Sequence, residues 1–318
     1  MISGQVLARL ATIAEQFQRA EPFRHVVIDD FLQPDVAAGL LAEFPAFDPK
    51  KAINENGEVG RKAVCERIRA LGPGYARLDD FIQSKEFLGQ VSAITGIPEL
   101  LYDPHYFGGG THDNRDGQGL DAHVDFNRHP VTHTHRRLNL IVYLNPDWQA
   151  DWGGVFELHR DPRASDDEIV QVVPLFNRAV IFETTERSWH GFSPITLPEA
   201  RQHEARRSIA LYFYSVDRPA DELAATHSTV YVDRPLPSHI AAGLTLVQAD
   251  VDELQRLLNE RDQHIQRLYR DTQRLNSKLE QTLRTVGLVR GSLVFRALAA
   301  AQRTLRSVLS SPSRQPPD

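Results

Sequence analysis

The stretch HVDFNRHPVTHTHRRLNLIVYLNPDW (123–148) joins a histidine–carboxylate pair to a strongly apolar strand. His123 and Asp125 are two residues apart, so in a strand their side chains lie on the same face. LNLIVYLN (138–145) predicts a buried strand because it is rich in β-branched and aromatic residues, and NPDW (145–148) predicts the turn that ends it. A histidine and a carboxylate on one strand face can bind the same metal ion.

Four more short apolar runs follow this strand, separated by turn residues. Short strands at this spacing predict an antiparallel sandwich or barrel. Strands with polar residues at one end suit a barrel with a site at its mouth. The runs are GGVFELH (153–159), EIVQVVPL (168–175), RAVIFET (178–184) and RSIALYFYS (207–215).

Residues 1–102 precede this region and predict a mainly helical lead-in, from apolar residues at helical spacing and from helix-start signals. The predicted elements are a helix over 5–20, a strand over 23–32, a helix over 35–44 started by Pro34 and Asp35, a polar loop over 48–62, and one or two helices over 78–101.

Composition limits the class of protein. Of the 318 residues 41% are hydrophobic and 25% are charged, as in a globular chain with a sizeable core. At ~150 residues a domain, this length predicts about two domains. The single cysteine, Cys65, excludes an intrachain disulfide and a cysteine-based zinc site, whereas there are 13 histidines. Any metal chemistry therefore uses nitrogen and oxygen ligands.

Residues 244–286 repeat apolar side chains at alternating steps of four and three, the heptad pattern of a coiled coil. The alternative is one long amphipathic helix packed on the rest of the chain. We expect a homo-oligomer, and β-branched residues at a with leucine at d favour a parallel dimer. Arg261 and Thr272 interrupt the seam and are candidates for fixing its register. The a positions are Val251, Leu258, Ile265, Thr272, Leu279 and Val286; the d positions are Val247, Leu254, Arg261, Leu268, Leu275 and Thr282.

The net charge of the chain also changes sign at residue 244. Of 36 basic and 42 acidic residues, 12 and 8 lie in 244–318, so this segment carries +4 and residues 1–243 carry −10. Arginines recur within the apolar segment 287–310, and this pattern predicts a basic amphipathic helix. Such a helix can contact a membrane surface or a protein, or it can continue the oligomer core. Residues 311–318 predict a disordered tail. With no signal-peptide or membrane-spanning pattern, we expect a cytoplasmic protein, peripheral to the membrane at most, that binds no nucleic acid.

Two H-x-D triplets occur, and their surroundings separate them. His159 and Asp161 lie where a strand gives way to the acidic turn DPRASDDE, and we expect that pair to be solvated. The pair His123 and Asp125 has a partner for a shared ion in His190, which follows the strand RAVIFET. Two histidines and one carboxylate form the facial arrangement that non-haem Fe(II) oxygen chemistry uses.

The last apolar strand offers a site for an anion. Arg206 and Ser208 share a strand face, with Ala210 and Tyr212 beyond them. The planar guanidinium suits a bidentate contact with a carboxylate, and the serine hydroxyl adds a donor. An arginine near a metal is what a metal-chelating dicarboxylic co-substrate needs at its far end. We expect the neighbouring Arg207 to be a cation at the protein surface.

HVD (123–125), SWHG around His190 and RRS (206–208) together resemble the 2-oxoglutarate/Fe(II)-dependent oxygenases. The resemblance is closest to the prolyl-4-hydroxylase-like branch, including bacterial homologues of the ribosomal-protein prolyl hydroxylases, and it extends over residues 23–235. It implies a double-stranded β-helix, or jelly roll, with N-terminal helices packed on it. Residues 1–237 would form this oxygenase domain, with the lead-in at 1–102 and the core at 103–235, followed by the coiled-coil helix.

The resemblance also implies a role for each residue. His123, Asp125 and His190 would bind Fe(II), and the far carboxylate of 2-oxoglutarate would reach Arg206. Ser208 would assist that arginine, and Tyr106 and Tyr143 would line the co-substrate pocket. The step from His190 to Arg206 is longer than usual in this family, which leaves Arg206 and Arg207 as alternatives, although the strand alternation favours Arg206.

The implied reaction is hydroxylation of a C–H bond with O2, releasing succinate and CO2, with ascorbate as a candidate reductant. The substrate is an unknown protein, peptide or small molecule, of prolyl, peptidyl or amino-acid-like type, and residues 48–75 and 108–122 are expected at its rim. We expect His129 to lie at the surface or to support the metal ligands from behind, and a substrate contact is the alternative. The alternatives are an inactive oxygenase-fold scaffold that oligomerises, or halogenation or epimerisation; the carboxylate of Asp125 disfavours halogenation, since the halogenases have a small residue there.

Overall fold

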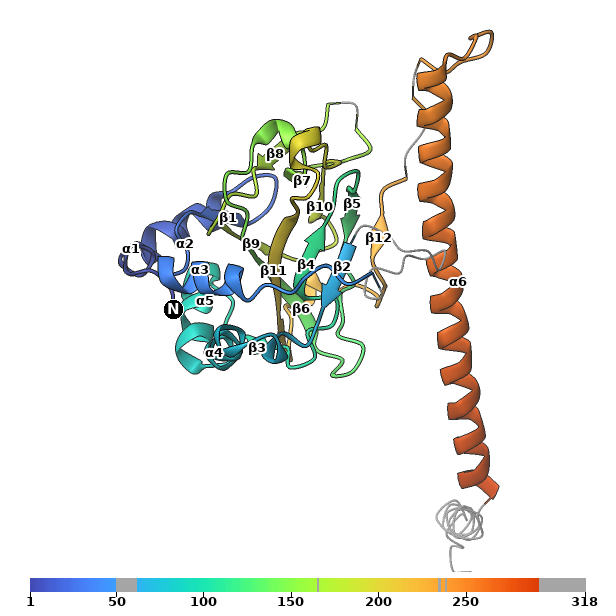
Figure 1. Cartoon of the computed structure of the whole chain (residues 1–318). Helices are drawn as coiled ribbons and strands as arrows, with labels where there is room; N and C mark the ends of the chain where they lie inside the picture. The colour runs from blue at the N-terminus through green and yellow to red at the C-terminus, as the bar shows by residue number, and fades with distance from the viewer. Residues whose placement is uncertain (50–61, 165, 234–235, 238, 292–318) are drawn as a thin grey trace, which may run out of the picture. The chain divides into compact units, whose positions relative to one another are not determined.

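The computed structural model describes residues 1–49, 62–164, 166–233, 236–237 and 239–291. The chain divides into two compact units, Met1–Leu244 and Thr245–Asp318 (Figure 1). The described part of the first unit combines two antiparallel sheets with helices, and that of the second contains one long helix. Most of the predicted basic helix over 287–310 and all of the predicted tail over 311–318 lie outside the described residues.

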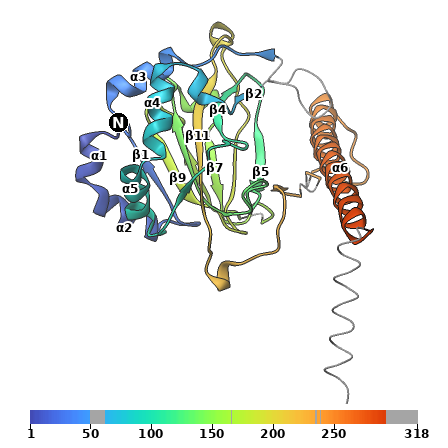
Figure 2. The ribbon, with the colours of Figure 1, turned by 90° about the horizontal axis from the view of Figure 1, so that it is seen from below.

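Two sheets face each other in the first unit. Among the described residues the larger sheet has seven strands, in the order β1-β9-β6-β11-β4-β2 with β3 paired to β11, and the smaller has five, in the order β12-β5-β10-β7-β8 (Figures 1 and 2). Phe182 and Tyr143 of the larger sheet pack with Phe156 and Leu158 of the smaller one in a shared apolar core. This arrangement agrees with a jelly-roll fold.

The strands of the larger sheet are β1 (His25–Ile28), β2 (Lys62–Cys65), β3 (Leu101–Tyr102), β4 (Gly110–Asn114), β6 (His135–Tyr143), β9 (Ala179–Glu183) and β11 (Arg206–Ser215). Those of the smaller sheet are β5 (Leu120–Val124), β7 (Phe156–His159), β8 (Ile169–Val172), β10 (Trp189–Phe192) and β12 (Val230–Tyr231). All five predicted apolar runs of the core are confirmed as strands. The lead-in also contributes β2 and β3, which the sequence did not predict.

In the part of the lead-in that the structure describes, five α-helices precede most of the strands. Their apolar residues share one core with the outward-facing residues of the larger sheet, such as Leu140, Ile209 and Leu211 (Figure 2). The predicted helix over 5–20 is two helices, because the backbone leaves the helical conformation at Arg9. The helices are α1 (Gly4–Ala8), α2 (Leu10–Arg19), α3 (Pro34–Ala42), α4 (Pro73–Ile82) and α5 (Lys85–Thr95); short 3₁₀ helices occur at Ile68–Ala70, Ala150–Trp152, Glu199–Arg201 and Ala220–Glu222.

The second unit begins with α6 (Gln248–Gly291), a continuous helix of 44 residues. The heptad segment is thus helical, while its self-association remains a prediction. No helix in the described ranges combines the length and the apolar character needed to cross a membrane.

Candidate metal and co-substrate site

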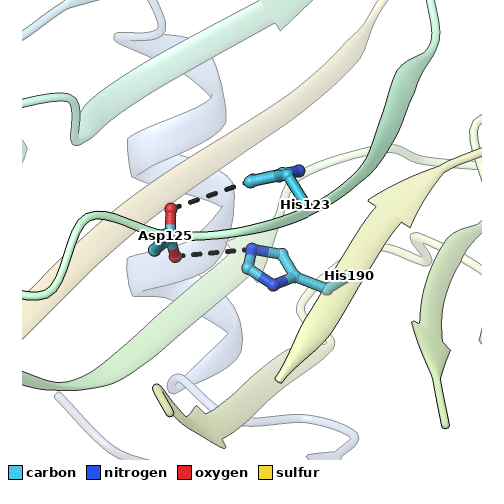
Figure 3. Close-up of side chains that lie close together, drawn as sticks. All are labelled: His123, Asp125 and His190. Carbon is cyan, nitrogen blue, oxygen red and sulfur yellow. Dashed lines mark ion pairs between the residues drawn. The ribbon is translucent and has the colours of Figure 1, made fainter. Parts of the chain in front are cut away.

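Three predicted ligands meet between two neighbouring strands of the smaller sheet. His123 in β5 lies directly opposite His190 in β10, and Asp125 follows the end of β5. The His123 Nε2 atom lies 3.8 Å from Asp125 Oδ1, and the His190 Nε2 atom lies 3.4 Å from Asp125 Oδ2 (Figure 3). One ligand atom from each residue falls within 4.8 Å of the others. His190, predicted only to follow a strand, is itself in a strand.

Gly191 lets these two strands approach. A Cβ atom at this position would collide with the backbone carbonyl of Leu120 in β5. Because glycine lacks that atom, β10 can lie close enough to β5 to bring the two imidazole rings to a centroid distance of 4.3 Å.

Both histidines have their Nδ1 atoms held by the backbone. Nδ1 of His123 lies 2.8 Å from the carbonyl oxygen of Asp121, and Nδ1 of His190 lies 2.8 Å from that of Ser188. A carbonyl oxygen can only accept, so Nδ1 carries the proton and Nε2 keeps its lone pair. This is the tautomer in which Nε2 can bind a metal.

Burial reinforces this state. Desolvation lowers the pKa of His123 to about 3, and the neighbouring His190 acts in the same direction. Burial also lowers the pKa of His190. Burial alone would raise the pKa of Asp125, but the charge of Arg136 and the two histidines hold it below its ordinary value. At neutral pH the site therefore offers two neutral imidazoles and one carboxylate.

The carboxylate of Asp125 is fixed by two residues of β6. Asn139 Nδ2 donates to Asp125 Oδ2 at 2.8 Å, and Arg136 Nη2 lies 3.0 Å from the same oxygen. Arg136 also donates to Asn139 Oδ1 and stacks on the rings of Phe126 and Tyr212. Sequence reasoning missed this network.

The triad lines a cavity of about 190 Å³ between the two sheets, which also contains Arg206 and Ser208 of β11. The wall includes His112 and Asn114 of β4, within the predicted rim over 108–122, whereas none of the described residues of the predicted rim over 48–75 contributes. Thr229 and Tyr231 also line the cavity. The only signal for them in the sequence is the resemblance of the segment 226–235 to the exit of the family's domain.

In this cavity the Arg206 side chain is buried beside two aromatic rings. It is 4% exposed, and its guanidinium lies 4.3 Å from the ring centroid of Phe192 and 4.9 Å from that of Tyr143. Nε donates to the carbonyl of Gly154 at 2.6 Å, and Nη2 donates to the Tyr143 hydroxyl at 3.3 Å. Nη1 forms no hydrogen bond with the described residues, so it is available to a ligand. Burial lowers the pKa of Arg206, and a negatively charged ligand would relieve this cost.

The two predicted tyrosines do not line the cavity. Tyr143 is fully buried in the core between the sheets, where it packs with Phe156, and its hydroxyl accepts a hydrogen bond from Arg206. Tyr106 lies elsewhere: its residue adopts a left-handed backbone conformation (φ 47°), and its hydroxyl donates to Asp79 of α4 at 2.7 Å. The turn aims its ring at the helical layer, so the prediction that Tyr106 lines the pocket is wrong.

The burial of His159 and the position of His129 also test the sequence-based expectations. His159 is buried rather than solvated, and its Nδ1 lies 2.7 Å from Asp167, although Asp161 is exposed as expected. His129 is 1% exposed; its Nδ1 accepts from the backbone N–H of Val131, and its Nε2 lies 3.3 Å from Asp103. His129 is not among the cavity residues, so the structure does not support a substrate contact, and its burial contradicts a surface position.

Known proteins match the part of the chain that holds this site. Residues 109–214 match the family model of the 2OG-Fe(II) oxygenase superfamily. A mouse protein, prolyl 3-hydroxylase OGFOD1 (Mus musculus), is 31% identical over 224 residues, which are 68% of this chain and 36% of that protein. The chain thus spans about a third of the length of this curated relative.

The similarity to solved structures is more distant. A prolyl hydroxylase from Trichoplax adhaerens, in complex with a hypoxia inducible factor peptide fragment, is 18% identical and has a TM-score of 0.46, with 67% of this chain and 94% of that chain covered. HygX from Streptomyces hygroscopicus, solved with nickel and 2-oxoglutarate, is 13% identical with a TM-score of 0.41, over 74% of this chain and 98% of that one. The family match identifies residues 109–214 as a 2OG-Fe(II) oxygenase domain, and the identity to the mouse hydroxylase supports the prolyl-hydroxylase-like branch of that superfamily.

Proposed function

We propose that this protein is an Fe(II)- and 2-oxoglutarate-dependent hydroxylase that oxidises a C–H bond of a prolyl, peptidyl or amino-acid-like substrate and releases succinate and CO2. The observation that carries the proposal is that His123, Asp125, His190 and Arg206 line one cavity. A metal triad and a buried cation in the same space match the two ends of a metal-chelating dicarboxylate.

The donor set fits Fe(II). Two neutral imidazole Nε2 atoms and one carboxylate converge, and all three side chains are at most 11% exposed. Two histidines and one carboxylate are the ligands of non-haem Fe(II) oxygenases, in which the bound metal supplies the oxygen chemistry. His123, Asp125 and His190 would hold the ion, and Asn139 and Arg136 would keep the carboxylate in place.

The chain's own residues would bind and orient the co-substrate. Arg206 would pair with its far carboxylate through the available Nη1, since arginine recognises carboxylates with a planar fork. Ser208 lies two residues along the same strand face and lines the cavity, so its hydroxyl can add a hydrogen bond. Phe192 and Phe156 in the wall exclude water from the bound dicarboxylate.

A prolyl or peptidyl substrate is supported by the relative with the name prolyl 3-hydroxylase, which is 31% identical over the part it shares with this chain. The cavity wall beyond the triad is aromatic and polar, with Phe126, Tyr212 and Tyr231. Aromatic side chains of this kind can pack on a pyrrolidine ring and leave hydroxyls for a peptide backbone.

The test is an assay of the full chain with Fe(II), 2-oxoglutarate, O2 and ascorbate. Succinate formation coupled to O2 uptake supports the proposal, and a gain of one oxygen atom in a proline-containing peptide library or cell extract identifies the substrate. An unchanged product mass would indicate epimerisation, and halide incorporation would indicate halogenation. Failure to bind Fe(II) and 2-oxoglutarate in a calorimetric titration would instead indicate an inactive scaffold.

A further inference from the structure

The helix α6 presents an apolar stripe that the described part of its own unit does not cover. Most of its apolar seam residues are exposed; for example, Leu258 is 58% and Leu275 is 65% exposed, while Val251 and Leu254 are half-buried. Exposed apolar seams of this length mark association surfaces. The other exposed seam residues are Ile265, Leu268, Leu279 and Val286.

A parallel pairing with a second copy would bring two like charges together in this seam. In a parallel dimer each a or d residue faces the same residue of the partner. Arg261 at a d position would then face Arg261 of the partner subunit inside the seam. Two like charges in a partly desolvated layer repel each other, so the central charge opposes this orientation.

An antiparallel pairing separates the two arginines, because residues at position a then face residues at position d of the partner. With the two-fold axis between Gln266 and Arg267, Arg261 faces Thr272 of the partner subunit, so two of the three polar seam positions meet each other. The third, Thr282, faces Val251 of the partner subunit. Asp271 of the partner subunit directly precedes Thr272 of the partner subunit, so a carboxylate flanks the layer in which Arg261 lies.

The same register matches the apolar positions. The facing pairs, with the second residue in the partner subunit, are Leu254–Leu279, Leu258–Leu275 and Ile265–Leu268. A shift by one heptad in either direction would instead set Arg261 against Ile265 or Leu279 of the partner subunit. The polar pair therefore selects one antiparallel register, as a single polar residue in a seam commonly does.

The flanking positions agree with this orientation. In an antiparallel pair g faces g and e faces e, which sets Asp271 opposite His264 of the partner subunit and Asp262 opposite Tyr269 of the partner subunit. No two like charges face each other along these flanks of the helix. Charges at e and g set the partner and the orientation of a coiled coil.

We infer that α6 pairs with α6 of a second copy as an antiparallel coiled coil in this register. Each oxygenase unit ends at Leu244, just before its helix begins at Gln248. The two units are therefore attached to opposite ends of the paired helices, which at ~1.5 Å per residue separate the attachment points by roughly 55 Å. The inference does not depend on the proposed reaction.

The first test is light scattering followed by disulfide trapping in the full chain. We expect twice the mass of the 35.9 kDa chain. In a Cys65→Ser background, Leu254→Cys and Leu279→Cys variants are oxidised separately and after mixing. Disulfide-linked dimers only in the mixture support the antiparallel register. Dimers of each variant alone would show a parallel pair, and a monomer or a larger assembly would also overturn the inference.

A second measurement avoids changes in the seam. A spin label on Ser277→Cys, in the same background, lies on the outer face of the helix at an f position. In the antiparallel register the labels of the two copies are displaced by roughly 32 Å along the axis, at ~1.5 Å per residue. Two labels at the same height along the helix axis would contradict the pairing. So would the absence of a dipolar signal together with a monomer mass from light scattering.

Discussion

Arg206 and Arg207 are consecutive in β11, and their side chains lie on opposite faces of the larger sheet. Arg206 lines the cavity of the triad, whereas Arg207 lines a separate cavity on the other face, where its guanidinium lies 5.9 Å from the ring centroid of Phe44. The alternation of a strand thus separates the two candidates for the co-substrate anchor, and the geometry supports Arg206.

The first prediction uses this pair of arginines. Arg206→Ala removes a charge-assisted contact with the far carboxylate of 2-oxoglutarate. We expect the KM for 2-oxoglutarate to rise about 100-fold, equivalent to ~3 kcal/mol for such a contact. Arg206→Lys should recover part of the affinity, since lysine keeps the charge but not the fork.

The matched control is Arg207→Ala, which changes the same residue type one position away. Its KM should stay within about threefold of the wild type, because Arg207 lies on the opposite face of the sheet, outside the cavity of the triad. A co-substrate KM that rises with Arg207→Ala and not with Arg206→Ala would assign the anchor to Arg207.

The second prediction compares the two H-x-D triplets. Asp125→Ala removes the only carboxylate of the triad, and we expect Fe(II) binding and succinate formation to fall to background. Asp161→Ala, the equivalent change in the second triplet, affects an exposed carboxylate that accepts from the Arg163 backbone N–H. Turnover of that variant should be unchanged; full turnover of Asp125→Ala would exclude the proposed metal site.

The third prediction concerns the support of Asp125. Asn139→Ala deletes the 2.8 Å hydrogen bond to the carboxylate but leaves all three ligands in place. Loss of such a supporting contact typically weakens metal affinity by about 10- to 100-fold. Titration with Mn(II) under anaerobic conditions measures the Kd, and a thermal unfolding midpoint near that of the wild type shows that the fold is intact. An unchanged Kd would mean that Arg136 alone positions the carboxylate.

The fourth prediction concerns stability rather than activity. Asp79 accepts from the hydroxyls of Tyr102 and Tyr106, each at 2.7 Å, and from Arg69. Burial raises the pKa of Asp79, but these hydrogen bonds outweigh it and hold the pKa below the ordinary 3.8. A carboxyl whose pKa is lower in the folded state stabilises the protein above its unfolded pKa, and this stability is lost as the pH falls through the folded value.

Asp79→Asn should therefore lower the free energy of unfolding at pH 7 by about 2 kcal/mol. The variant should also lose less stability than the wild type between pH 5 and pH 3, about the range in which the unfolded carboxyl titrates. Urea denaturation at several pH values measures both effects. Parallel stability curves for the two proteins would show that Asp79 does not contribute to the acid dependence.

Much of the site follows from local spacing in the sequence. The i, i+2 rule places His123 with Asp125 and Arg206 with Ser208, because each pair lies on or at the end of a strand with one buried face. It misses Arg136, because β6 carries an extra residue between the positions paired with Phe213 and Tyr214 of β11. This bulge breaks the alternation, so Arg136 and Asn139 face the same cavity although three positions separate them.

Other failures arise from contacts between distant segments. The hydroxyl of Tyr106 finds its acceptor, Asp79, 27 residues earlier in a helix, and a positive φ turns its ring away from the cavity. His159 is buried by its pairing with Asp167 across a turn. Neither partner is visible in the local pattern, which shows a tyrosine near a glycine run and a histidine at the end of a strand.

The carbonyls of Asp121 and Ser188 that hold the two histidine Nδ1 atoms belong to the main chain, each two residues before the ring it orients. No single amino-acid substitution deletes a main-chain carbonyl. A saturation mutagenesis screen for lost activity should therefore identify His123, Asp125, His190 and Arg206, yet tolerate many side chains at position 121, which is half-buried. Position 188 differs, because the Ser188 side chain is fully buried and its hydroxyl donates to the carbonyl of Thr185. Genetic robustness at position 121 would reflect the chemistry of the peptide bond rather than a lack of function there.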